Sequence, residues 1–438
     1  MSYGGGIFLT QNKVLPGAYI NYSSITKASS TISDRGYAAI GLELDWGPDK
    51  QIFKVEQEDF QEHPEMYFGY DYTSDKLKAL RDLFLYLKTG YFYRLNSGGN
   101  KASCIYGTAK YSGICGNNIK VVISQNVDDT SKWDFTTYYN NTVVDTQTGI
   151  STMKDLKNND FVDWKTDAEI TDTVGTNFTN GTNGTAASGT DHSNFLDLLE
   201  SYPINILICT STDEIVKKLY ASYAKRMRDD EGAKFQAVLY GYSGDYEGII
   251  NVTTQAVDAD FGESALVYWV GGVEASCQIN ESCGNKVYDG EFAMTVATKQ
   301  SALKKHITNG EFVFHQVADG EYRVLKDINS FVSFSKTRTR DFSLNQVIRV
   351  LDQIGNDAAT LFNKTYLDKS QNEDEDRMAL WDDLCDYAKK LLKLKAITDF
   401  KTSDITVEKG EGKEDVLVNF NVTPVAAMEK LYMYVYVA

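Results

Sequence analysis

The chain has 438 residues, of which 42% are hydrophobic, and it carries a formal net charge of −17. That apolar content is enough to build packed cores, which excludes global disorder, and no apolar run approaches the roughly 20 residues needed to span a bilayer. The acidic balance argues against sequence-independent binding of nucleic acid, because such binding requires a basic surface.

The first 24 residues predict an extended arm. They are rich in Gly and polar residues, and the turn Pro16-Gly17 precedes a short apolar pattern that is compatible with a strand. The chain does not open with a basic segment followed by an apolar stretch. We therefore expect synthesis in the cytoplasm without a secretory signal.

Residues 37–96 predict a strand, a helix and a second strand. The stretch "YAAIGLELDWGP" (37–48) reads as a buried strand that ends at a Gly-Pro break. "KLKALRDLFLYLKTG" (76–90) spaces its apolar residues at helical intervals and places Gly90 where a C-cap belongs. "YFYRLN" (91–96) then predicts the second strand.

A change of composition marks residues 98–192 as a separate, mostly β domain. Its beginning is Gly-rich with short apolar segments, and the chain then stays rich in Thr, Asn and Asp without an amphipathic helical pattern. We expect this domain to end in the loose loop "TNGTNGTAASGTDHS" (179–193).

Strands and helices alternate again after residue 193, which predicts a layered α/β or α+β core. Strands are expected at 205–211, 235–242 and 248–257, and helices at 213–231 and 264–278. Asp319-Gly320 is typical of a hairpin turn between two strands within 311–334. Two further helices are expected, from Ser343 to about Leu367 and over 373–395.

The end of the chain predicts a strand with nothing to cover it. Residues 416–438 suggest two strands around a break at Pro424. The second strand alternates apolar residues with tyrosines in the period of two that strands require: Leu431, Tyr432, Met433, Tyr434, Val435, Tyr436 and Val437. An apolar edge strand invites pairing with another chain.

No arrangement of residues predicts catalysis or a cofactor. The four histidines form no HExxH or HxH motif, and neither a P-loop nor a GxSxG elbow is present. Cys277 and Cys283 are six residues apart without a nearby histidine, so the six cysteines are expected to be reduced, packed thiols. The acidic run 373–376 lacks the ligand pattern of a calcium loop. We predict no catalytic residue, no metal and no cofactor.

Two basic segments stand out in this acidic chain. One is "SKTRTRDFS" (335–343), and the other is the end of the last predicted helix, with Lys389, Lys390, Lys393 and Lys395. Solvated faces explain such clusters in most proteins. Charge complementarity to a partner is the alternative.

Five stretches, in the same order and at similar spacing, give the chain a resemblance to the tail sheath proteins of contractile phage tails and related bacteriocin-like particles of Gram-positive type. They are "LPGAYINY", "RGYAAIGLELDWGPDKQIFKV" (35–55), "AKYSGICGNNIKVVI" (109–123), "NGEFVFHQVADGEYRVLKDINSF" (309–331) and "VTPVAAMEKLYMYVYV" (422–437). The segment 125–192 matches poorly, as expected for a variable insertion.

The resemblance implies an α+β multidomain fold with a mixed α/β core. The expected parts are an N-terminal arm (1–24), a core made of 25–97 and 193–415 that can divide near residue 335, an inserted β-rich outer domain (98–192) and a C-terminal strand arm (416–438). It also implies a non-enzymatic subunit that forms hexameric rings, stacked helically around an inner tube, and contracts to drive that tube through a cell envelope.

The same resemblance implies partners and contact residues. The partners are further copies of this chain, the inner tube protein, and the baseplate and terminator or collar proteins, with no direct contact to nucleic acid and no membrane insertion. Strand exchange between subunits would use Leu431–Val437 together with Val14, Ala18, Tyr19, Ile20 and Tyr22. Lys389, Lys390, Lys393 and Lys395 are the candidates for contact with the tube. The mature protein would lie in a virion tail or a released tail-like particle.

Two other readings remain open on the sequence. A cell-surface adhesin built on the Thr- and Asn-rich β domain would need an export signal or an anchor. A Rossmann-like enzyme built on residues 195–290 would need a clustered acid–base set, and the sequence displays none.

Overall fold

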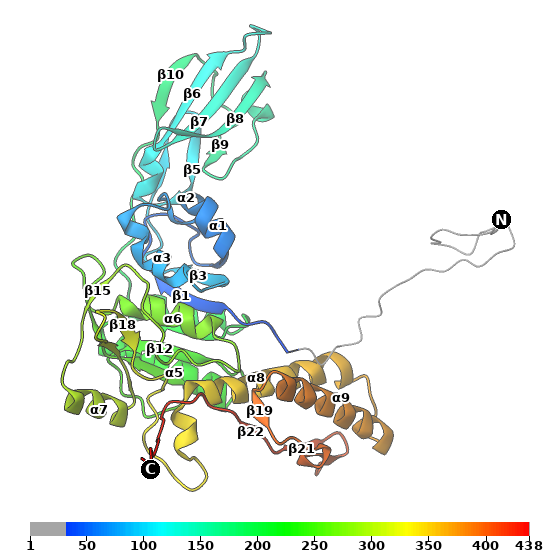
Figure 1. Ribbon diagram of the computed structural model, residues 1–438. Coiled ribbons are helices and arrows are strands. Elements are labelled where there is room, and N and C mark those ends of the chain that lie inside the picture. The colour runs from blue at the N-terminus through cyan, green and yellow to red at the C-terminus, as the bar shows by residue number, and fades with distance from the viewer. Residues whose placement is uncertain (1–31, 438) are drawn as a thin grey trace, which may run out of the picture. The chain divides into compact units, whose positions relative to one another are not determined.

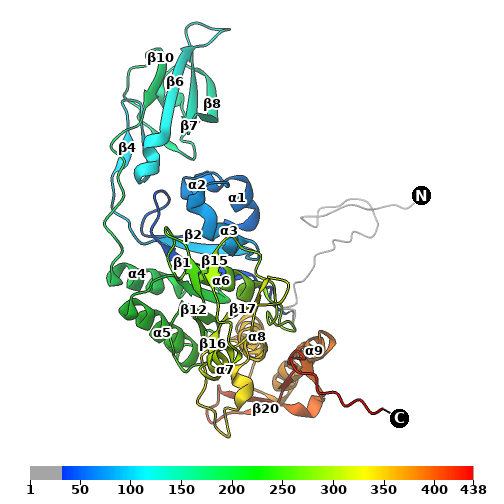
Figure 2. The same ribbon diagram turned by 60° about the vertical axis from the view of Figure 1, so that its left-hand side comes forward.

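A computed structural model describes residues 32–437. Within these residues the chain divides into two compact units. The large unit contains residues 33–356, 393–398 and 423–437, and the small unit contains residues 357–392 and 399–422. Figures 1 and 2 show the elements of each unit.

A seven-stranded sheet forms the centre of the large unit, in the order β16-β13-β12-β11-β1-β3-β2. Every neighbouring pair is parallel except β2 and β3. The strands are β1 (Tyr37–Leu42), β2 (Ile52–Glu56), β3 (Thr89–Arg94), β11 (Ile206–Cys209), β12 (Gln236–Tyr240), β13 (Ile249–Val252) and β16 (Glu311–Phe312).

Helices cover both faces of this sheet because its strands are apolar on both sides. Ile40 and Ile208 belong to one core with residues of α3 (Lys78–Phe84) and α6 (Leu266–Ser276). Ala39 and Leu207 belong to a second core with α4 (Gly189–Leu199) and α5 (Glu214–Asp229). This doubly wound arrangement confirms the expected mixed α/β core (Figure 2).

Two antiparallel sheets make up the inserted β region between β3 and α4. Their orders are β4-β5-β9 and β10-β6-β7-β8. A third core fills this region and includes Trp46 and Phe135. The strands are β4 (Lys101–Ser103), β5 (Gly107–Ser112), β6 (Ile119–Gln125), β7 (Trp133–Tyr139), β8 (Thr142–Ile150), β9 (Val162–Trp164) and β10 (Thr173–Asn177).

Short elements complete the large unit. The predicted Asp319-Gly320 hairpin is confirmed, and Gly320 adopts the left-handed φ of 93° that such a turn needs. The remaining elements are α1 (Gln57–Glu62), α2 (Pro64–Phe68), β14 (Gln255–Val257), β15 (Ala293–Thr295), α7 (Gln300–Thr308), β17 (Phe314–Gln316), β18 (Tyr322–Val324), β19 (Ile397–Thr398) and β22 (Thr423–Pro424).

The small unit is helical and ends in a hairpin. The helix α8 (Asn345–Leu361) runs into it and continues as a π-helical turn over Phe362–Tyr366. The Tyr387 hydroxyl of α9 (Asp374–Lys393) donates to Asp357 at 2.8 Å. The strands β20 (Ile405–Lys409) and β21 (Val416–Phe420) form the hairpin.

Several expected elements differ from the structure. The helix α3 ends at Phe84, and Gly90 is not its C-cap but lies inside β3, where it is paired with Ala38. Residues 248–257 form two strands rather than one, because β13 joins the central sheet while β14 pairs with β15. The expected loop 179–193 is shortened by α4, whose start carries a capping box of Ser188 and Asp191.

The cysteines were expected to be packed thiols, and most of them are buried. All six lie among the described residues as unpaired thiols, and five of them are buried. Among residues 32–437, no helix is long and apolar enough to cross a membrane.

Candidate assembly interface

The C-terminal segment is the most exposed apolar stretch of the described chain. The seven side chains from Leu431 to Val437 are between 71% and 94% exposed. Residues 425–437 form no strand in the isolated chain, and Figure 1 draws them as an irregular trace after β22. The expected final strand is therefore absent from the single chain. A strand is defined by ladder hydrogen bonds, and this segment pairs with no other strand among residues 32–437.

The beginning of the segment makes three contacts with the rest of the large unit. The backbone N–H of Val425 donates to the Ala396 carbonyl at 2.9 Å, and the N–H of Ala427 donates to Gln346 at 2.9 Å. Glu429 then forms an ion pair with Lys326 at 2.5 Å. Glu429, the last of these three residues, lies two positions before Leu431, where the alternating pattern begins.

The hairpin of β20 and β21 is a two-stranded sheet with both outer edges open. Its five residue pairs run from Ile405↔Phe420 to Lys409↔Val416, and neither strand pairs with a third strand among the described residues. The Trp381 indole N–H of α9 donates to the Ile405 carbonyl at 2.9 Å, which fixes one end of the hairpin. Leu417 and Val418 are 51% and 38% exposed. An isolated hairpin of this kind is marginal in water.

A hollow of about 560 Å³ lies in the small unit beside the start of β21. Phe362 and Tyr366 of the π-helical turn form one wall, with Leu380, Arg377 and Val416 around them. The two rings are stacked with centroids 6.4 Å apart. The hollow provides space for a side chain beside Val416, the first residue of β21.

The predicted N-terminal contact residues, Val14, Ala18, Tyr19, Ile20 and Tyr22, lie outside the described residues. Their pairing with a neighbouring subunit stays a prediction.

The lysines proposed as tube contacts are all exposed. Lys389 forms an ion pair with Asp386 at 2.8 Å, with both side chains more than half exposed. Lys390, Lys393 and Lys395 are exposed as well. In the other basic segment, Arg338 pairs with Glu247 at 3.0 Å, while Lys336 and Arg340 are exposed. Exposed basic side chains of this kind can meet an acidic partner.

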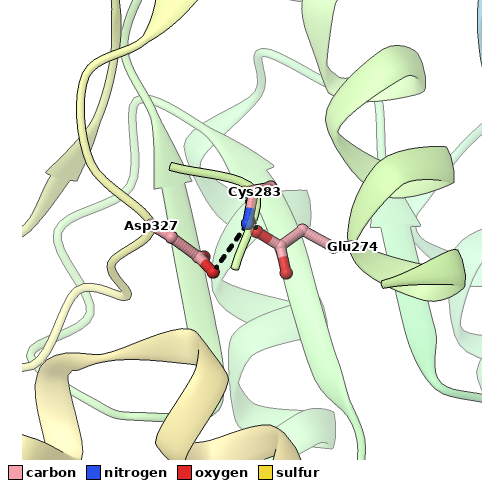
Figure 3. A group of neighbouring side chains, drawn as sticks. All are labelled: Glu274, Cys283 and Asp327. Carbon is pink, nitrogen blue, oxygen red and sulfur yellow. Dashed lines mark hydrogen bonds between the residues drawn. The ribbon is translucent and has the colours of Figure 1, made fainter. Parts of the chain in front are cut away.

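One cluster in the described residues has the composition of a metal site. Glu274, Cys283 and Asp327 are fully buried, and one possible ligand atom of each lies within 4.8 Å of the others (Figure 3). The Arg349 guanidinium lies against the carboxylates of Glu274 and Asp327. It donates to Glu274 Oε2 at 2.6 Å and lies 3.4 Å from Asp327 Oδ2. A cation is thus already supplied by the chain, so this cluster is a structural ion network.

Burial controls the protonation of this network. Burial, followed by the charge of Asp327, raises the pKa of Glu274 to about 8. Burial also acts to raise the pKa of Asp327, but Arg349 and hydrogen bonds from its neighbours lower it overall. Glu274 therefore holds a proton at neutral pH while Asp327 stays charged and paired with Arg349. The Cys283 thiol donates to Glu274 Oε1 at 3.0 Å and is buried.

The hairpin of β20 and β21 was not predicted from the sequence. "ITVEK" (405–409) was not expected to be a strand, although Ile405 and Val407 alternate with polar residues and the Gly-containing segment 410–415 separates them from "VLVNF". That pattern of two short alternating segments around a Gly-containing turn would have predicted a hairpin.

Three models of sheath protein domains match the chain. They describe a phage tail sheath β-sandwich domain (residues 97–183), a phage tail sheath central domain (185–330) and a phage tail sheath C-terminal domain (337–438). The chain is 30% identical to the phage-like element PBSX protein XkdK of Bacillus subtilis, over 98% of this chain and 99% of that protein.

Solved structures agree with these matches. The sheath tail protein of Desulfitobacterium hafniense is 31% identical, with a TM-score of 0.78 over 95% of this chain and 99% of that one. The helical sheath of the anti-feeding prophage in its contracted state has a TM-score of 0.58 over 97% of this chain and 99% of that one. Since the latter is only 12% identical, it supports the shared fold alone.

Proposed function

This chain belongs to the phage tail sheath family, and from that premise we propose that it forms hexameric rings, stacked helically around an inner tube, that contract to drive the tube through a target cell envelope. Its role as a structural protein of the tail sheath follows from the family. The ring, the contraction and the absence of any enzymatic activity are the proposal.

The exposed segment Leu431–Val437 is the observation that supports this proposal. Seven consecutive large side chains in water are unfavourable for a free monomer, and fully burying one Leu, Val or Met contributes roughly 1.5–3 kcal/mol. Burying one face of this segment in a neighbouring subunit would therefore supply several kcal/mol before the cost of association. The described part of the chain leaves these side chains exposed, and we assign their cover to another copy.

The β20–β21 hairpin is the acceptor that fits such a segment. Its open edges can accept main-chain hydrogen bonds, and the hollow beside β21 can receive a side chain of the added strand. Strand addition from copy to copy does not close on itself and generates a helical array. The N-terminal arm, residues 1–24, would add a second link of the same kind.

Contraction would then be a rigid-body rearrangement of subunits joined by these strands. The extended array would be metastable, held by the tube and the baseplate, and a few kcal/mol per subunit would suffice because many subunits act in series. The exposed lysines at the end of α9 and just after it would contact the tube: Lys389, Lys390, Lys393 and Lys395. The inserted β region would face outward. The mature protein would lie in a virion tail or a released tail-like particle after synthesis in the host cytoplasm.

Negative-stain electron microscopy of the purified full chain tests this proposal. We expect striated hollow tubes from the wild type and their loss on truncation after Glu429. The variant Tyr434→Pro should also prevent assembly, because proline removes a ladder N–H in the middle of the added strand. Tyr434→Phe, which keeps that N–H and the ring, is the matched control and should assemble.

The thermal unfolding of the monomer separates assembly from folding. Residues 431–437 are exposed in the single chain, so truncation and Tyr434→Pro should leave the unfolding midpoint unchanged. Tubes formed equally well by Tyr434→Pro and by the wild type would contradict strand addition through this segment.

A further inference from the structure

Two cysteines are brought together at the end of α6. Cys277 is the C-cap of that helix, and its N–H donates to the Val273 carbonyl at 2.8 Å. Cys283 follows six positions later, and both side chains belong to the core that α6 forms with the central sheet. The two thiols are hydrogen-bonded to each other. A thiol in contact with a second thiol can form a disulfide, which an isolated buried thiol cannot.

The segment between the two cysteines is held at several points. The Glu281 N–H donates to the Gln278 carbonyl at 3.0 Å, and the Glu281 carbonyl accepts from the Arg349 guanidinium at 2.6 Å. The Cys283 N–H donates to Asp327 Oδ2 at 3.2 Å (Figure 3). These bonds fix the turn between the cysteines and so hold the two sulfur atoms near each other.

The two thiols differ in how easily they ionise. The hydrogen bond from Cys283 lowers the pKa of Cys277, and the charge of Arg349 acts in the same direction against burial. Burial raises the pKa of Cys283 well above its ordinary value. Cys277 is also the more accessible thiol, since it is 9% exposed and Cys283 is 1% exposed. Cys277 therefore has the properties of an attacking thiolate, and Cys283 those of a thiol that resolves the product.

Oxidation of the pair leaves no buried acceptor without a partner. The single proton of the Cys283 thiol can be donated to Glu274 Oε1 at 3.0 Å or, when Cys277 is ionised, to the Cys277 sulfur. Glu274 Oε1 also accepts from Asn345 Nδ2 at 3.3 Å. Glu274 Oε1 thus stays hydrogen-bonded when Cys283 loses its proton. A buried polar atom deprived of its last partner would oppose the reaction, and that cost does not arise here.

We propose that Cys277 and Cys283 are an oxidation site, at which a hydroperoxide converts the two thiols into a disulfide. The Cys277 thiolate attacks one oxygen of hydrogen peroxide, the O–O bond breaks, and a sulfenic acid and hydroxide are formed. The Cys283 sulfur then attacks the Cys277 sulfur and the S–O bond breaks, so that the hydroxyl leaves with the Cys283 proton as water. The hydroxide takes up the proton that Cys277 had released. The thiols lose two electrons and two protons, and the peroxide becomes two water molecules.

Peptide mapping of the full chain after treatment with hydrogen peroxide tests this proposal, which depends on neither strand exchange nor contraction. Trypsin releases residues 235–286, which contain no methionine and no cysteine other than Cys277 and Cys283. We expect this peptide to become lighter by two hydrogen atoms and to lose both alkylatable thiols. Proteolysis after Glu281 should leave the two cysteine fragments joined until dithiothreitol is added. A peptide that stays fully alkylated, or that gains oxygen without a link between its cysteines, would show that the proposal is wrong.

The two single variants should give different products. Cys283→Ser removes the resolving thiol, so Cys277 should accumulate as a sulfenic acid that dimedone labels. Cys277→Ser removes the attacking thiolate, so Cys283 should be neither labelled nor linked. Cys104→Ser, which changes a partly buried thiol in the inserted β region, is the control and should form the disulfide as the wild type does. Equal labelling of the two single variants would overturn the roles assigned to the two sulfurs, and the wild-type peptide map requires no variant to fold.

Discussion

The buried pair Glu274 and Asp327 predicts that the large unit loses stability as pH rises through the neutral range. The folded-state pKa of Glu274 is about 8, compared with 4.5 for a free glutamic acid. Between these values the folded protein holds a proton that the unfolded chain has released. Raising the pH therefore favours unfolding, by about 1.4 kcal/mol per pH unit. The stabilising contribution is complete below pH 4.5 and is lost as pH rises through about 8.

Other groups act in the opposite direction in the window from pH 6.5 to 8, so the comparison with a Glu274 variant is what isolates this effect. The pKa values of His192 and His315 are lowered, mainly by burial, and stability therefore rises with pH until the unfolded imidazoles have lost their protons, at about pH 7.5. The pKa of Cys277 is lowered chiefly by its hydrogen bond with Cys283 and has the same sign of effect. The pKa of Asp82 is about 6, so its contribution lies below the window. Across 1.5 pH units the free energy of unfolding should fall by about 2 kcal/mol because of Glu274.

Urea unfolding followed by tryptophan fluorescence at several pH values measures this loss. Glu274→Gln provides the comparison because an amide cannot release a proton in this range. The variant should be less stable at pH 6.5 by about 1–3 kcal/mol, since it disturbs the hydrogen bond from Arg349, but its stability should fall less steeply toward pH 8. Parallel curves for the two proteins would show that Glu274 is ionised in the folded state and would refute the reasoning.

Three further predictions concern other parts of the molecule. Arg228→Ala should destabilise the large unit by about 3–5 kcal/mol in urea unfolding, because Asp352, which now receives two hydrogen bonds from Arg228, would stay buried without its partner; an unchanged midpoint would contradict this. Trp381→Phe should speed hydrogen exchange in 405–409 and 416–420 while leaving exchange in the central sheet unchanged, since it removes the bond to the Ile405 carbonyl. Replacing Lys389, Lys390, Lys393 and Lys395 by Gln should weaken binding to purified tubes in a salt-dependent manner without changing monomer stability; equal binding at low salt would remove these residues from the proposed tube contact.

The elements that the sequence predicted well are those whose pattern matches their surroundings. Residues 213–231 and 264–278 were expected to be helical, and α5 and α6 lie within them. The strand at 205–211 was expected because a short apolar run suits a sheet covered on both faces, and β11 is fully buried. Gly90 was misassigned because a glycine after a helical pattern usually marks its end. Here the glycine lies in β3, close to the ring of Phe92, and its place was decided by packing rather than by local sequence.

The exposed segment of the candidate interface could be predicted from the sequence, whereas the cavity at the ends of β1 and β11 could not. Alternation in Leu431–Val437 is local, so it was visible in seven letters, although the segment pairs with no strand among the residues that the structure describes. Gly41 and Thr210 are far apart in the sequence and line one cavity of about 420 Å³ because β1 and β11 are neighbours in the sheet. A pattern within one segment predicts what that segment needs from a partner. A site made of two strand ends depends on the order of strands in the sheet, which crossover connections fix and no single segment encodes.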